Sequence, residues 1–344
     1  MIFKPYTRLN LLPDRSGWVT SWENRALSEI LRKLNIDIVS RRLTPFQVCY
    51  LPSKYYAVSV GYYHHILRNR LAFDYYHGDP SITPAFKPLF EKLKQKRRCF
   101  QRIRVSHTGI ENLLKNEGFE REVFRIPIGL ELEWFPIQTS ESRKDARRRL
   151  GIPQSAVVIG SFQKDGNGWG EGNEPKLIKG PDILLETLEI LKSRIPELFV
   201  LLTGPSRGFV KTGLESLKIP YKHHNYQDYR ELWKSYHALD AYLVTSREEG
   251  GPKAVLESMA SGVPLISTRV GQAQDLVRHG INGWITEVED SEGLADHALQ
   301  VFEGAAFVEE VRKNARHTAE QNSYDAQLEL WREFFHPLLS SPPR

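Results

Sequence analysis

The chain has 344 residues, 40% of them hydrophobic and 26% charged, which is the composition of a soluble globular protein with room for two domains. No apolar run is long enough to span a membrane, and the segment 1–8 lacks the apolar region of a secretory signal. The two cysteines, Cys49 and Cys99, have no cysteine or histidine partners at metal-ligand spacing. These features argue against an integral membrane protein and a Cys/His metal site, and they predict a protein of the reducing cytoplasm.

Charge is unevenly spread along the chain, although its formal sum is only +5. Residues 1–150 contain 27 Lys and Arg against 15 Asp and Glu, a balance of +12, whereas the remainder has 20 against 27, a balance of −7. The asymmetry predicts that the first half of the chain meets an anionic partner. Nucleic acid, an acidic lipid surface and a phosphorylated acceptor all remain open at this point.

Residues 1 to about 138 have the pattern of one α/β unit. A strand near Ile2–Tyr6 is followed by a polar turn that contains Gly17, and helical spacing then runs from Trp22 to Leu34. A second strand is predicted near Ile36–Ser40. The apolar run that starts at Leu71 ends at His77, just before a Gly-Asp-Pro turn. Ligand-binding groups cluster at the ends of parallel strands, so His77 is a candidate site residue, with a purely structural turn role as the alternative.

The segment Lys87–Arg104 is strongly basic and helical in character. Phe90, Leu93 and Phe100 are its expected inward-facing positions. Its single acid is Glu91, and its eight basic residues are Lys87, Lys92, Lys94, Lys96, Arg97, Arg98, Arg102 and Arg104. A solvated face and a peripheral contact with anionic lipid, at on the order of 1 kcal/mol per basic residue, are both compatible with this pattern. Nucleic acid ranks lower, because no recognised nucleic-acid-binding motif accompanies the charges.

From Ala156 onward a second α/β unit is predicted, after a polar linker and helix over residues 137–149. Helical patterns such as Pro181–Arg194 and Tyr229–Ala238 alternate with short apolar runs, which predicts a parallel sheet covered by helices on both faces. The predicted strands are Ala156–Ser161, Leu198–Thr203, Ala241–Val244, Pro264–Ser267 and Trp284–Thr286. A last helix over Ser323–Leu339 carries Tyr324, Leu328, Trp331 and Phe335 on one face.

A glycine-rich run, residues 160–173, follows the first strand of this second unit. It fits neither the G-x-G-x-x-G nor the P-loop pattern, so neither a dinucleotide site nor an ATPase is indicated. Lys164 lies within the run, and Lys179-Gly180-Pro181 precedes the next helix. Two such cations can stabilise the charge that develops on a departing diphosphate.

The stretch Ser246–Thr268 contains the most informative motif. Glu249, Gly250 and Gly251 follow a buried strand, and Pro252 begins a helix that Gly262, in a left-handed conformation, is expected to end. Paired glycines let a ligand approach the backbone, and a helix N-terminus favours a diphosphate. Glu249 in the loop and Glu257 in the helix can accept hydrogen bonds from vicinal sugar hydroxyls.

This segment, Glu249 to Glu257, resembles the E-x7-E motif of retaining glycosyltransferases of family 4, which have the GT-B fold. Residues 103–119 and 123–135 also resemble that family, although Ile128 and Glu131 replace its usual Asn and Asp. The resemblance implies two Rossmann-like domains that face each other across a cleft. It places the acceptor-side domain at 1–138, the nucleotide-sugar domain at 139–320, and at 321–344 a helix that crosses back to the first domain, followed by a loose tail.

The resemblance also implies roles for individual residues. Glu249 would face the donor sugar, Glu257 would hold the ribose, and Lys164 and Lys179 would neutralise the diphosphate, with His77 near the sugar or acceptor. The other donor-binding positions that it implies are Gly250, Gly251, Pro252, Lys253, Gly204, Tyr226, Thr268 and Gly271. Gly17 would lie on the acceptor side. This sequence departs from the family pattern in having a single glycine at Gly17 and Gln272 in place of a second glycine.

The function implied is a retaining glycosyltransferase that moves a sugar from a nucleoside diphosphate, UDP or GDP, to a glycan, lipid-linked or other hydroxyl acceptor. No Asp-x-Asp pair occurs in the chain, so a metal-independent reaction without cofactor is expected, with no nucleic acid partner and a location in the cytoplasm or at the inner face of the membrane. A phosphorylase or sugar-phosphate synthase differs only in its acceptor and stays open. A catalytically silent sugar-nucleotide-binding or scaffold subunit is the alternative from another class.

Overall fold

The computed structural model describes residues 8–14, 19–39, 44–61 and 63–340. It divides into two compact units. The first contains the described residues up to Ile128 together with those from Tyr324 on, and the second runs from Gly129 to Ser323. The boundaries predicted at 138 and 320 both fall inside the second unit, near its two ends.

The first unit is built on a six-stranded sheet in the order β2-β1-β3-β4-β5-β6, in which all neighbouring strands are parallel. Its elements are β1 (Leu9–Leu11), α1 (Val19–Lys33), β2 (Ile38–Val39), β3 (Val48–Leu51), α2 (Lys54–Ser59), α3 (Tyr63–Ile66), β4 (Arg70–Asp74), η1 (Pro84–Phe86), α4 (Lys87–Gln95), η2 (Arg97–Cys99), β5 (Phe100–Val105), α5 (Thr108–Asn116), β6 (Val123–Arg125) and α14 (Leu328–Ser340). The strand predicted at Ile2–Tyr6 and the turn residue Gly17 lie outside the described residues.

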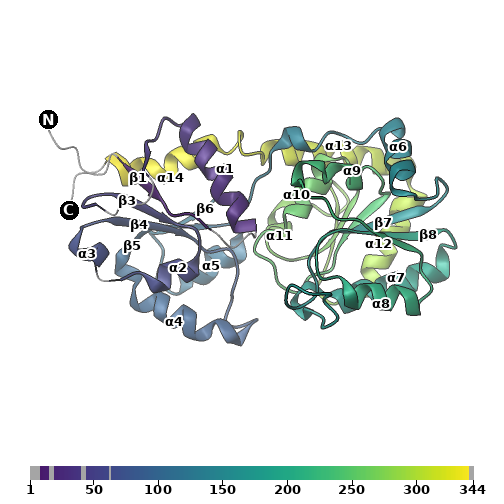
Figure 1. Cartoon of the computed structure of the whole chain (residues 1–344), viewed down its shortest axis with the longest axis horizontal. Coiled ribbons are helices and arrows are strands. Elements are labelled where there is room, and N and C mark those ends of the chain that lie inside the picture. Colours follow the sequence, from purple (N-terminus) through teal and green to yellow (C-terminus); the bar gives the residue numbers. More distant parts are fainter. Residues whose placement is uncertain (1–7, 15–18, 40–43, 62, 341–344) are drawn as a thin grey trace. The chain divides into compact units, whose positions relative to one another are not determined.

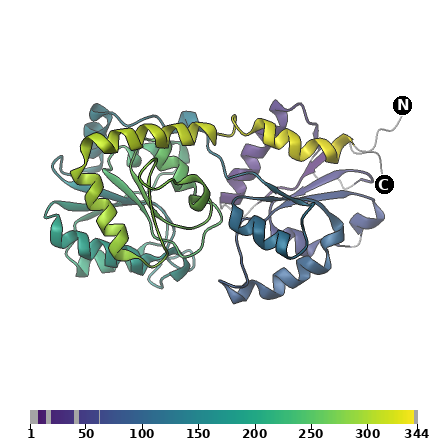
Figure 2. The same ribbon diagram turned by 180° about the vertical axis from the view of Figure 1, so that it is seen from behind.

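Helices cover both faces of this sheet (Figures 1 and 2). On one face α1 and α14 bury Leu31, Trp331 and Phe335 against β1 and β3, and on the other face α2, α4 and α5 form a separate apolar core. The last helix therefore packs within the first unit. It begins at Leu328, five residues later than predicted, because Ser323 forms a β-bridge with Leu130 and residues 324–327 form turns.

The prediction that the segment Lys87–Arg104 is helical in character is confirmed only for its first part. Helix α4 ends at Gln95, and residues 100–105 form the buried strand β5. Phe90, Leu93 and Phe100 are buried as expected, but Arg104 is only 1% exposed. The pattern misled because a strand that is covered on both faces shows no alternation of polar and apolar residues.

The second unit has a six-stranded parallel sheet in the order β12-β11-β10-β7-β8-β9. Its elements are η3 (Leu132–Trp134), α6 (Ser140–Leu150), β7 (Val157–Ser161), η4 (Leu177–Lys179), α7 (Pro181–Arg194), β8 (Leu198–Leu202), α8 (Gly208–Ser216), β9 (Tyr221–His223), η5 (Tyr229–Glu231), α9 (Trp233–Tyr236), β10 (Ala241–Val244), α10 (Lys253–Ala260), β11 (Leu265–Thr268), α11 (Ala273–Leu276), β12 (Trp284–Thr286), α12 (Ser291–Glu303) and α13 (Ala305–Gln321). Read from β9, this is the strand order of the Rossmann fold.

Two apolar cores flank the second sheet, one under α6, α9, α10 and α13, and the other under α7, α8 and α12 (Figure 1). The prediction of two Rossmann-like α/β units is thereby confirmed. The single helix predicted over Tyr229–Ala238 is instead the two short helices η5 and α9, and β9 was not predicted. Within the part of the chain that the structure describes, no helix combines the length and apolarity needed to cross a bilayer.

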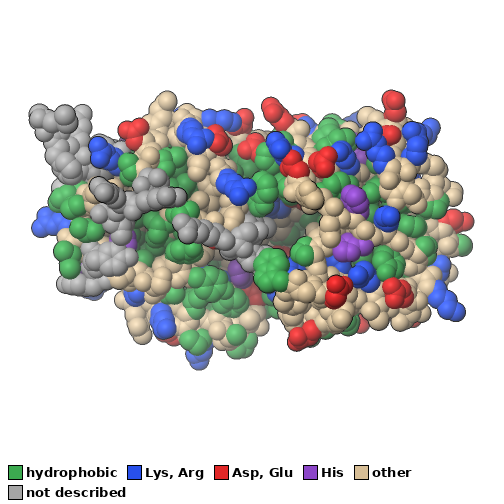
Figure 3. Space-filling view, viewed as in Figure 1, with side chains coloured by type: hydrophobic (Ala, Val, Ile, Leu, Met, Phe, Trp, Pro, Cys, Tyr) green, Lys and Arg blue, Asp and Glu red, His purple; other side chains and the backbone are tan. Residues whose placement is uncertain are grey.

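Part of the basic excess of residues 1–150 lies on α6, which belongs to the second unit. Figure 3 shows Lys and Arg side chains gathered over this helix. Its five basic residues are Arg143, Lys144, Arg147, Arg148 and Arg149. Arg147 is fully buried, and both it and Arg143 pair with Asp240, at 2.7 and 2.5 Å. The excess of positive charge in the first half of the sequence is therefore divided between the two units, and part of it is paired within the second.

A buried polar network at Arg104 joins four elements of the first unit. The guanidinium donates to Glu23 Oε2 of α1 at 3.0 Å and to the hydroxyl of Tyr76 at 2.7 Å, and it lies 4.6 Å from the ring centre of Trp331 in α14. Asp74 of β4 lies 3.7 Å from Arg104. The two buried carboxylates, Glu23 and Asp74, thus share the Arg104 guanidinium. Burial raises the pKa of Asp74 from 3.8 to about 6, although the positive charge of Arg104 acts to lower it.

We predict a pH-dependent stability that Asp74→Asn removes. A raised pKa means that the folded state binds the proton more tightly than the unfolded chain. This contribution is therefore fully present below about pH 3.8 and is lost as the pH rises through about 6. A shift of about 2 units corresponds to about 3 kcal/mol. Denaturant unfolding of both proteins from pH 4 to 7 should show wild-type stability falling relative to the variant by up to that amount. If the stabilities of the wild type and the variant changed in parallel with pH, the raised pKa of Asp74 would be contradicted.

Candidate functional site

The candidate site of the second unit lies where the order of strands reverses. Strands β7 and β10 are neighbours in the sheet, but the chain leaves β7 toward β8 and leaves β10 toward β11. At such a switch point the loops diverge and leave a crevice at the carboxyl ends of the strands, where open α/β sheets bind ligands. The loop after β7 carries Lys164, and the loop after β10 carries Glu249.

Lys179 and Glu249 form an ion pair in this region. Lys179 Nζ lies 2.6 Å from Glu249 Oε1, and the Ser246 hydroxyl donates to the same oxygen at 2.9 Å. The two side chains are 22% and 10% exposed, so the pair is sheltered but still open to solvent. Residues that are 70 positions apart in the sequence thus meet, and each was predicted as a site residue.

The turn at Gly180 brings Lys179 to this place. Gly180 has φ +60°, and a Cβ built on it would lie 1.9 Å from the carbonyl oxygen of Thr245, so only glycine fits. The Thr245 hydroxyl donates to the Gly180 carbonyl at 2.8 Å, and Pro181 begins α7 with a ring that needs no backbone partner. The close approach holds the start of α7 against the end of β10.

Thr268 and Gly271 support the backbone around Glu249. The Thr268 hydroxyl donates to the Ser246 carbonyl at 2.7 Å. Gly271 has φ +49°, and a Cβ there would lie 2.9 Å from the carbonyl oxygen of Glu249. Gly250 and Gly251 lead to Pro252, which is the N-cap of α10 rather than its first residue. The expected left-handed Gly262 after this helix is confirmed, with φ +68°.

Glu257 lies inside α10 with two tyrosine partners that were not predicted. It is 4% exposed, and its two oxygens accept hydrogen bonds from Tyr229, and from Tyr236 at 2.9 Å. Burial raises its pKa, while the Tyr229 bond and the charge of Lys253 oppose that effect. Lys253 Nζ donates to the Gly129 carbonyl at 3.1 Å. The hydroxyls of a ribose bound at Glu257 would have to donate to the carboxylate lone pairs that do not already accept from Tyr229 and Tyr236.

Lys176 is a further cation at this site that was not predicted. Burial and the positive charges of Lys179 and Lys164 lower its pKa, and Glu249 opposes them. These four residues, Lys164, Lys176, Lys179 and Glu249, are named here the lysine–glutamate cluster. Lys176 falls in a Pro-Lys-Leu-Ile-Lys segment three residues before Lys179. The sequence signal that could have identified Lys176 is its spacing of three residues from Lys179, which corresponds to a single 3₁₀ turn.

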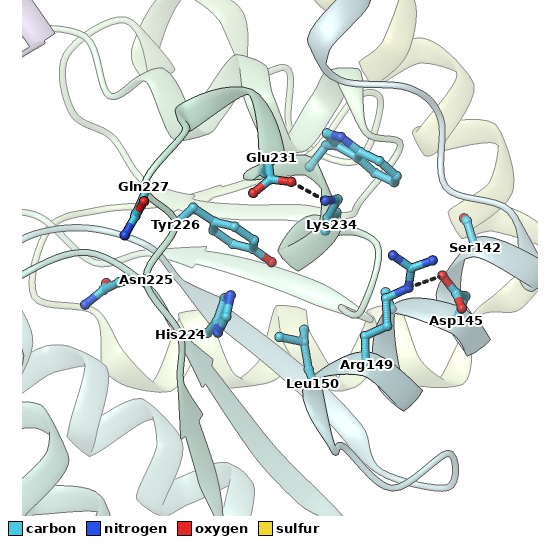
Figure 4. Close-up of a pocket in the computed structure, with 12 residues that line it drawn as sticks. Ser142, Asp145, Arg149, Leu150, His224, Asn225, Tyr226, Gln227, Glu231 and Lys234 are labelled. Carbon is cyan, nitrogen blue, oxygen red and sulfur yellow. Dashed lines mark hydrogen bonds and ion pairs between the residues drawn. The ribbon is translucent and has the colours of Figure 1, made fainter.

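Gly204 and Tyr226 lie on neighbouring segments of the same unit. Gly204 has φ +84°, and its carbonyl lies 2.8 Å from His223 Nε2. Tyr226 lines a pocket of about 630 Å³ between α6 and residues 224–234. Figure 4 shows its ring on one wall and the Arg149 guanidinium on the opposite wall. The pocket residues include no member of the lysine–glutamate cluster.

His77 lies in the first unit, just beyond the end of β4. Its ring packs edge-on against Phe86 with centroids 5.6 Å apart, and its carbonyl accepts a hydrogen bond from Lys54 Nζ. Lys54 is 2% exposed and also lies 4.3 Å from the centre of the Phe86 ring. The structure thus holds the backbone of His77 firmly. Gly17, the predicted acceptor-side residue, is outside the described residues.

Gly180→Ala is predicted to destabilise the protein by more than Gly151→Ala. Both glycines have positive φ values, +60° and +70°, so each alanine pays about 1–2 kcal/mol for a left-handed conformation. A Cβ at Gly151 meets nothing within 4 Å, whereas at Gly180 it meets the Thr245 carbonyl oxygen. Denaturant unfolding should give an additional loss of at least about 1 kcal/mol for Gly180→Ala. Equal losses of unfolding free energy in the two variants would mean that the loop at Thr245 can move away from a Cβ at position 180 without a free-energy cost.

Comparison with known proteins identifies relatives of this chain. Residues 175–318 match the family model described as glycosyl transferases group 1. The chain is 27% identical over 266 residues to D-inositol 3-phosphate glycosyltransferase of Corynebacterium urealyticum, covering 70% of this chain and 60% of that protein. It is 30% identical over 183 residues to the putative teichuronic acid biosynthesis glycosyltransferase TuaC of Bacillus subtilis, covering 51% and 40%. The matches thus span only part of these relatives.

Among solved structures, Anabaena Alr3699/HepE in complex with UDP and glucose superimposes with a TM-score of 0.76 at 16% identity, covering 96% of this chain and 99% of that one. At this identity the likeness concerns the fold, and it confirms the predicted GT-B class of two Rossmann-like domains. The family match and the curated relatives together support a relationship of this chain to the group 1 glycosyl transferases.

Proposed function

We propose that the protein is a retaining glycosyltransferase of family 4 that transfers a sugar from a nucleoside diphosphate to a hydroxyl acceptor. The observation that carries this proposal is the Lys179–Glu249 pair at 2.6 Å, held at the switch point of a Rossmann-type sheet. A cation beside a carboxylate suits a diphosphate next to a sugar ring, because the first neutralises phosphate and the second accepts hydroxyl hydrogens.

In the proposed reaction, the bond between the sugar C1 and the diphosphate oxygen breaks and the diphosphate leaves with its electron pair. Lys179 and Lys164 stabilise the charge that accumulates on it. The acceptor hydroxyl forms a new bond to C1 on the same face, and its proton passes to the departing phosphate oxygen. The configuration at C1 is therefore retained, and no metal ion or protein base takes part. Glu249 orients the sugar and Glu257 binds the ribose.

UDP is the preferred donor nucleotide in this proposal, with GDP as the second choice. Support comes from the ligands named for structures of similar fold, which include UDP with glucose and UDP with GlcNAc. The acceptor is proposed to be a glycan or a lipid-linked hydroxyl, as in polysaccharide biosynthesis. The names of relatives, an inositol phosphate glycosyltransferase and a teichuronic acid enzyme, are compatible with a hydroxyl on an anionic molecule.

A cytoplasmic location with peripheral contact to an anionic membrane is proposed for the surface at Lys87, Lys92 and Arg98. These residues of α4 and η2 are exposed. Other members of the predicted basic segment have intramolecular partners. Lys96 Nζ donates to the carbonyls of Val58 and Val60, both at 2.7 Å, and Lys94 pairs with Glu117 at 2.7 Å. Any membrane attraction therefore depends on fewer charges than the sequence suggests.

A nucleotide-sugar should stabilise the protein in the presence of EDTA. We predict that one of the UDP-, GDP-, ADP- and TDP-sugars raises the melting temperature, since a ligand at ~100 times its Kd adds about 2.7 kcal/mol. Glu257→Ala should lose this ligand-induced shift, whereas Glu287→Gln, an exposed carboxylate of the same unit, should keep it. Each shift is measured against the variant's own unliganded melting temperature. No shift with any sugar nucleotide in the wild type would contradict the proposal.

Lys179→Met and Glu249→Gln should separate binding from transfer. We predict that Lys179→Met weakens the nucleoside diphosphate by about 10- to 100-fold but leaves the nucleoside unaffected, because a charge-assisted hydrogen bond to phosphate is worth about 1.5–3 kcal/mol. Glu249→Gln should retain diphosphate binding and lose transfer. Calorimetry and product analysis by NMR give both quantities, with Lys222→Met as the charge control. Tight binding without any transfer by the wild type would favour the scaffold alternative.

A further inference from the structure

The glycine-rich run between β7 and η4 forms a hairpin, defined here as residues 165–176. Gly166 and Pro175 face each other in an antiparallel bridge. The Asn167 N–H donates to the Glu174 carbonyl at 2.9 Å, and the Lys176 N–H donates to the Asp165 carbonyl at 2.8 Å. The run that fits no phosphate-binding motif is therefore an ordered projection from the sheet.

The hairpin is fastened to the start of α8. Asp165 and Arg207 are both fully buried and form an ion pair with Oδ2 and Nη2 2.9 Å apart. The Ser206 hydroxyl donates to the Gly170 carbonyl at 2.9 Å, and the Gly208 N–H donates to the Glu171 carbonyl at 2.7 Å. A loop anchored in this way holds its tip in place before a ligand arrives, which lowers the entropic cost of binding.

The tip of the hairpin exposes a tryptophan. Trp169 is 65% exposed, and the flanking Gly168 and Gly170 have open space around them. Lys164 Nζ lies 4.8 Å from the centre of the indole ring. An exposed indole of this size contributes little to folding, but it offers a flat apolar face, and tryptophan is prominent among residues that dominate binding.

The indole adjoins an excess of positive charge. Lys164, which lies against Trp169, directly precedes Asp165, whose carbonyl accepts the Lys176 N–H at 2.8 Å. The Lys176 carbonyl in turn accepts the Lys179 N–H at 2.8 Å. Lys179 pairs with the Glu249 carboxylate at 2.6 Å. The three lysines of the lysine–glutamate cluster outnumber its one carboxylate, which favours a ligand with a negative group, and the indole face of Trp169 favours a ligand with an apolar face.

We infer that Trp169 and Lys176 form a subsite for a sugar that carries a carboxylate or a phosphate. The C–H face of a pyranose ring would stack on the indole, and the anionic substituent would bind Lys176. This sugar is assigned to the acceptor, because Lys176 adjoins Lys179 in one turn, and the proposed function uses the Lys179–Glu249 pair for the donor. Only the assignment to the acceptor rests on that function.

The test uses three probes that share one ring and differ in charge: glucose, glucuronic acid and glucose 6-phosphate. Their affinities for the full chain are measured by ligand-observed NMR with saturating UDP, which occupies any diphosphate site. Both charged sugars should bind at least about 10-fold more tightly than glucose. Trp169→Ala should weaken all three sugars by about 10-fold. Lys176→Met should remove the preference for charge and leave glucose unaffected.

Matched controls and UDP affinity make the outcome decisive. Phe307→Ala removes another exposed ring of the same unit, and Lys222→Met removes another exposed lysine; neither should alter sugar binding. UDP affinity should stay within about twofold in Trp169→Ala. Equal binding of charged and neutral sugars, displacement of the sugars by UDP, or a matching loss of UDP affinity in Trp169→Ala would overturn the inference. Failure of UDP to bind the wild type would instead overturn the proposed function. The affinities of the three sugars would still test the subsite in that case.

Discussion

The close approach of two backbone segments at Gly180 organises the second unit. With the Thr245 carbonyl oxygen only 1.9 Å from where a Cβ would stand, the chain can enter α7 here only through a glycine in the left-handed region. This contact fixes the start of α7 against the loop after β10, and Lys179 and Glu249 are then within hydrogen-bonding distance. The rest of the cluster is arranged around that pair. A steric constraint on one residue thus sets the chemistry of the site.

Each unit contains a buried ion pair, and the free-energy cost of burying charge explains how its partners are arranged. Arg207 in the second unit bonds to Asp165 and to the carbonyls of Ser161 and Thr203, at 2.6 and 2.8 Å. Arg104 in the first unit is likewise surrounded by acceptors. A buried ion pair is a weak source of stability unless hydrogen bonds satisfy the remaining donors, and both guanidinium groups meet that condition. They join strand ends to helices, so they position loops more than they stabilise the fold.

The same burial changes how the charge of the sequence should be interpreted. Several of the basic residues that give the first 150 positions their excess have structural partners. Arg104 and Arg147 are buried, and Lys96 binds two backbone carbonyls. Cationic groups near the proposed reaction centre come instead from the acidic second half of the chain, at Lys164, Lys176 and Lys179. The positions of the charged side chains in the folded protein, and not the net charge of a long sequence segment, decide where an anion binds favourably.

The sequence by itself determined the fold class and the backbone of the site. Apolar runs between turn residues predicted β10, β12 and α7 to the residue, and Gly262 was correctly expected in a left-handed conformation. These are local patterns, in which spacing and steric preference act over a few residues. The tertiary structure alone decided that Tyr229 and Tyr236 bond to Glu257, that Lys179 pairs with Glu249, and that Arg104 is buried against Glu23. Each depends on residues far apart in the chain, and their contact follows from how the strands are ordered and packed.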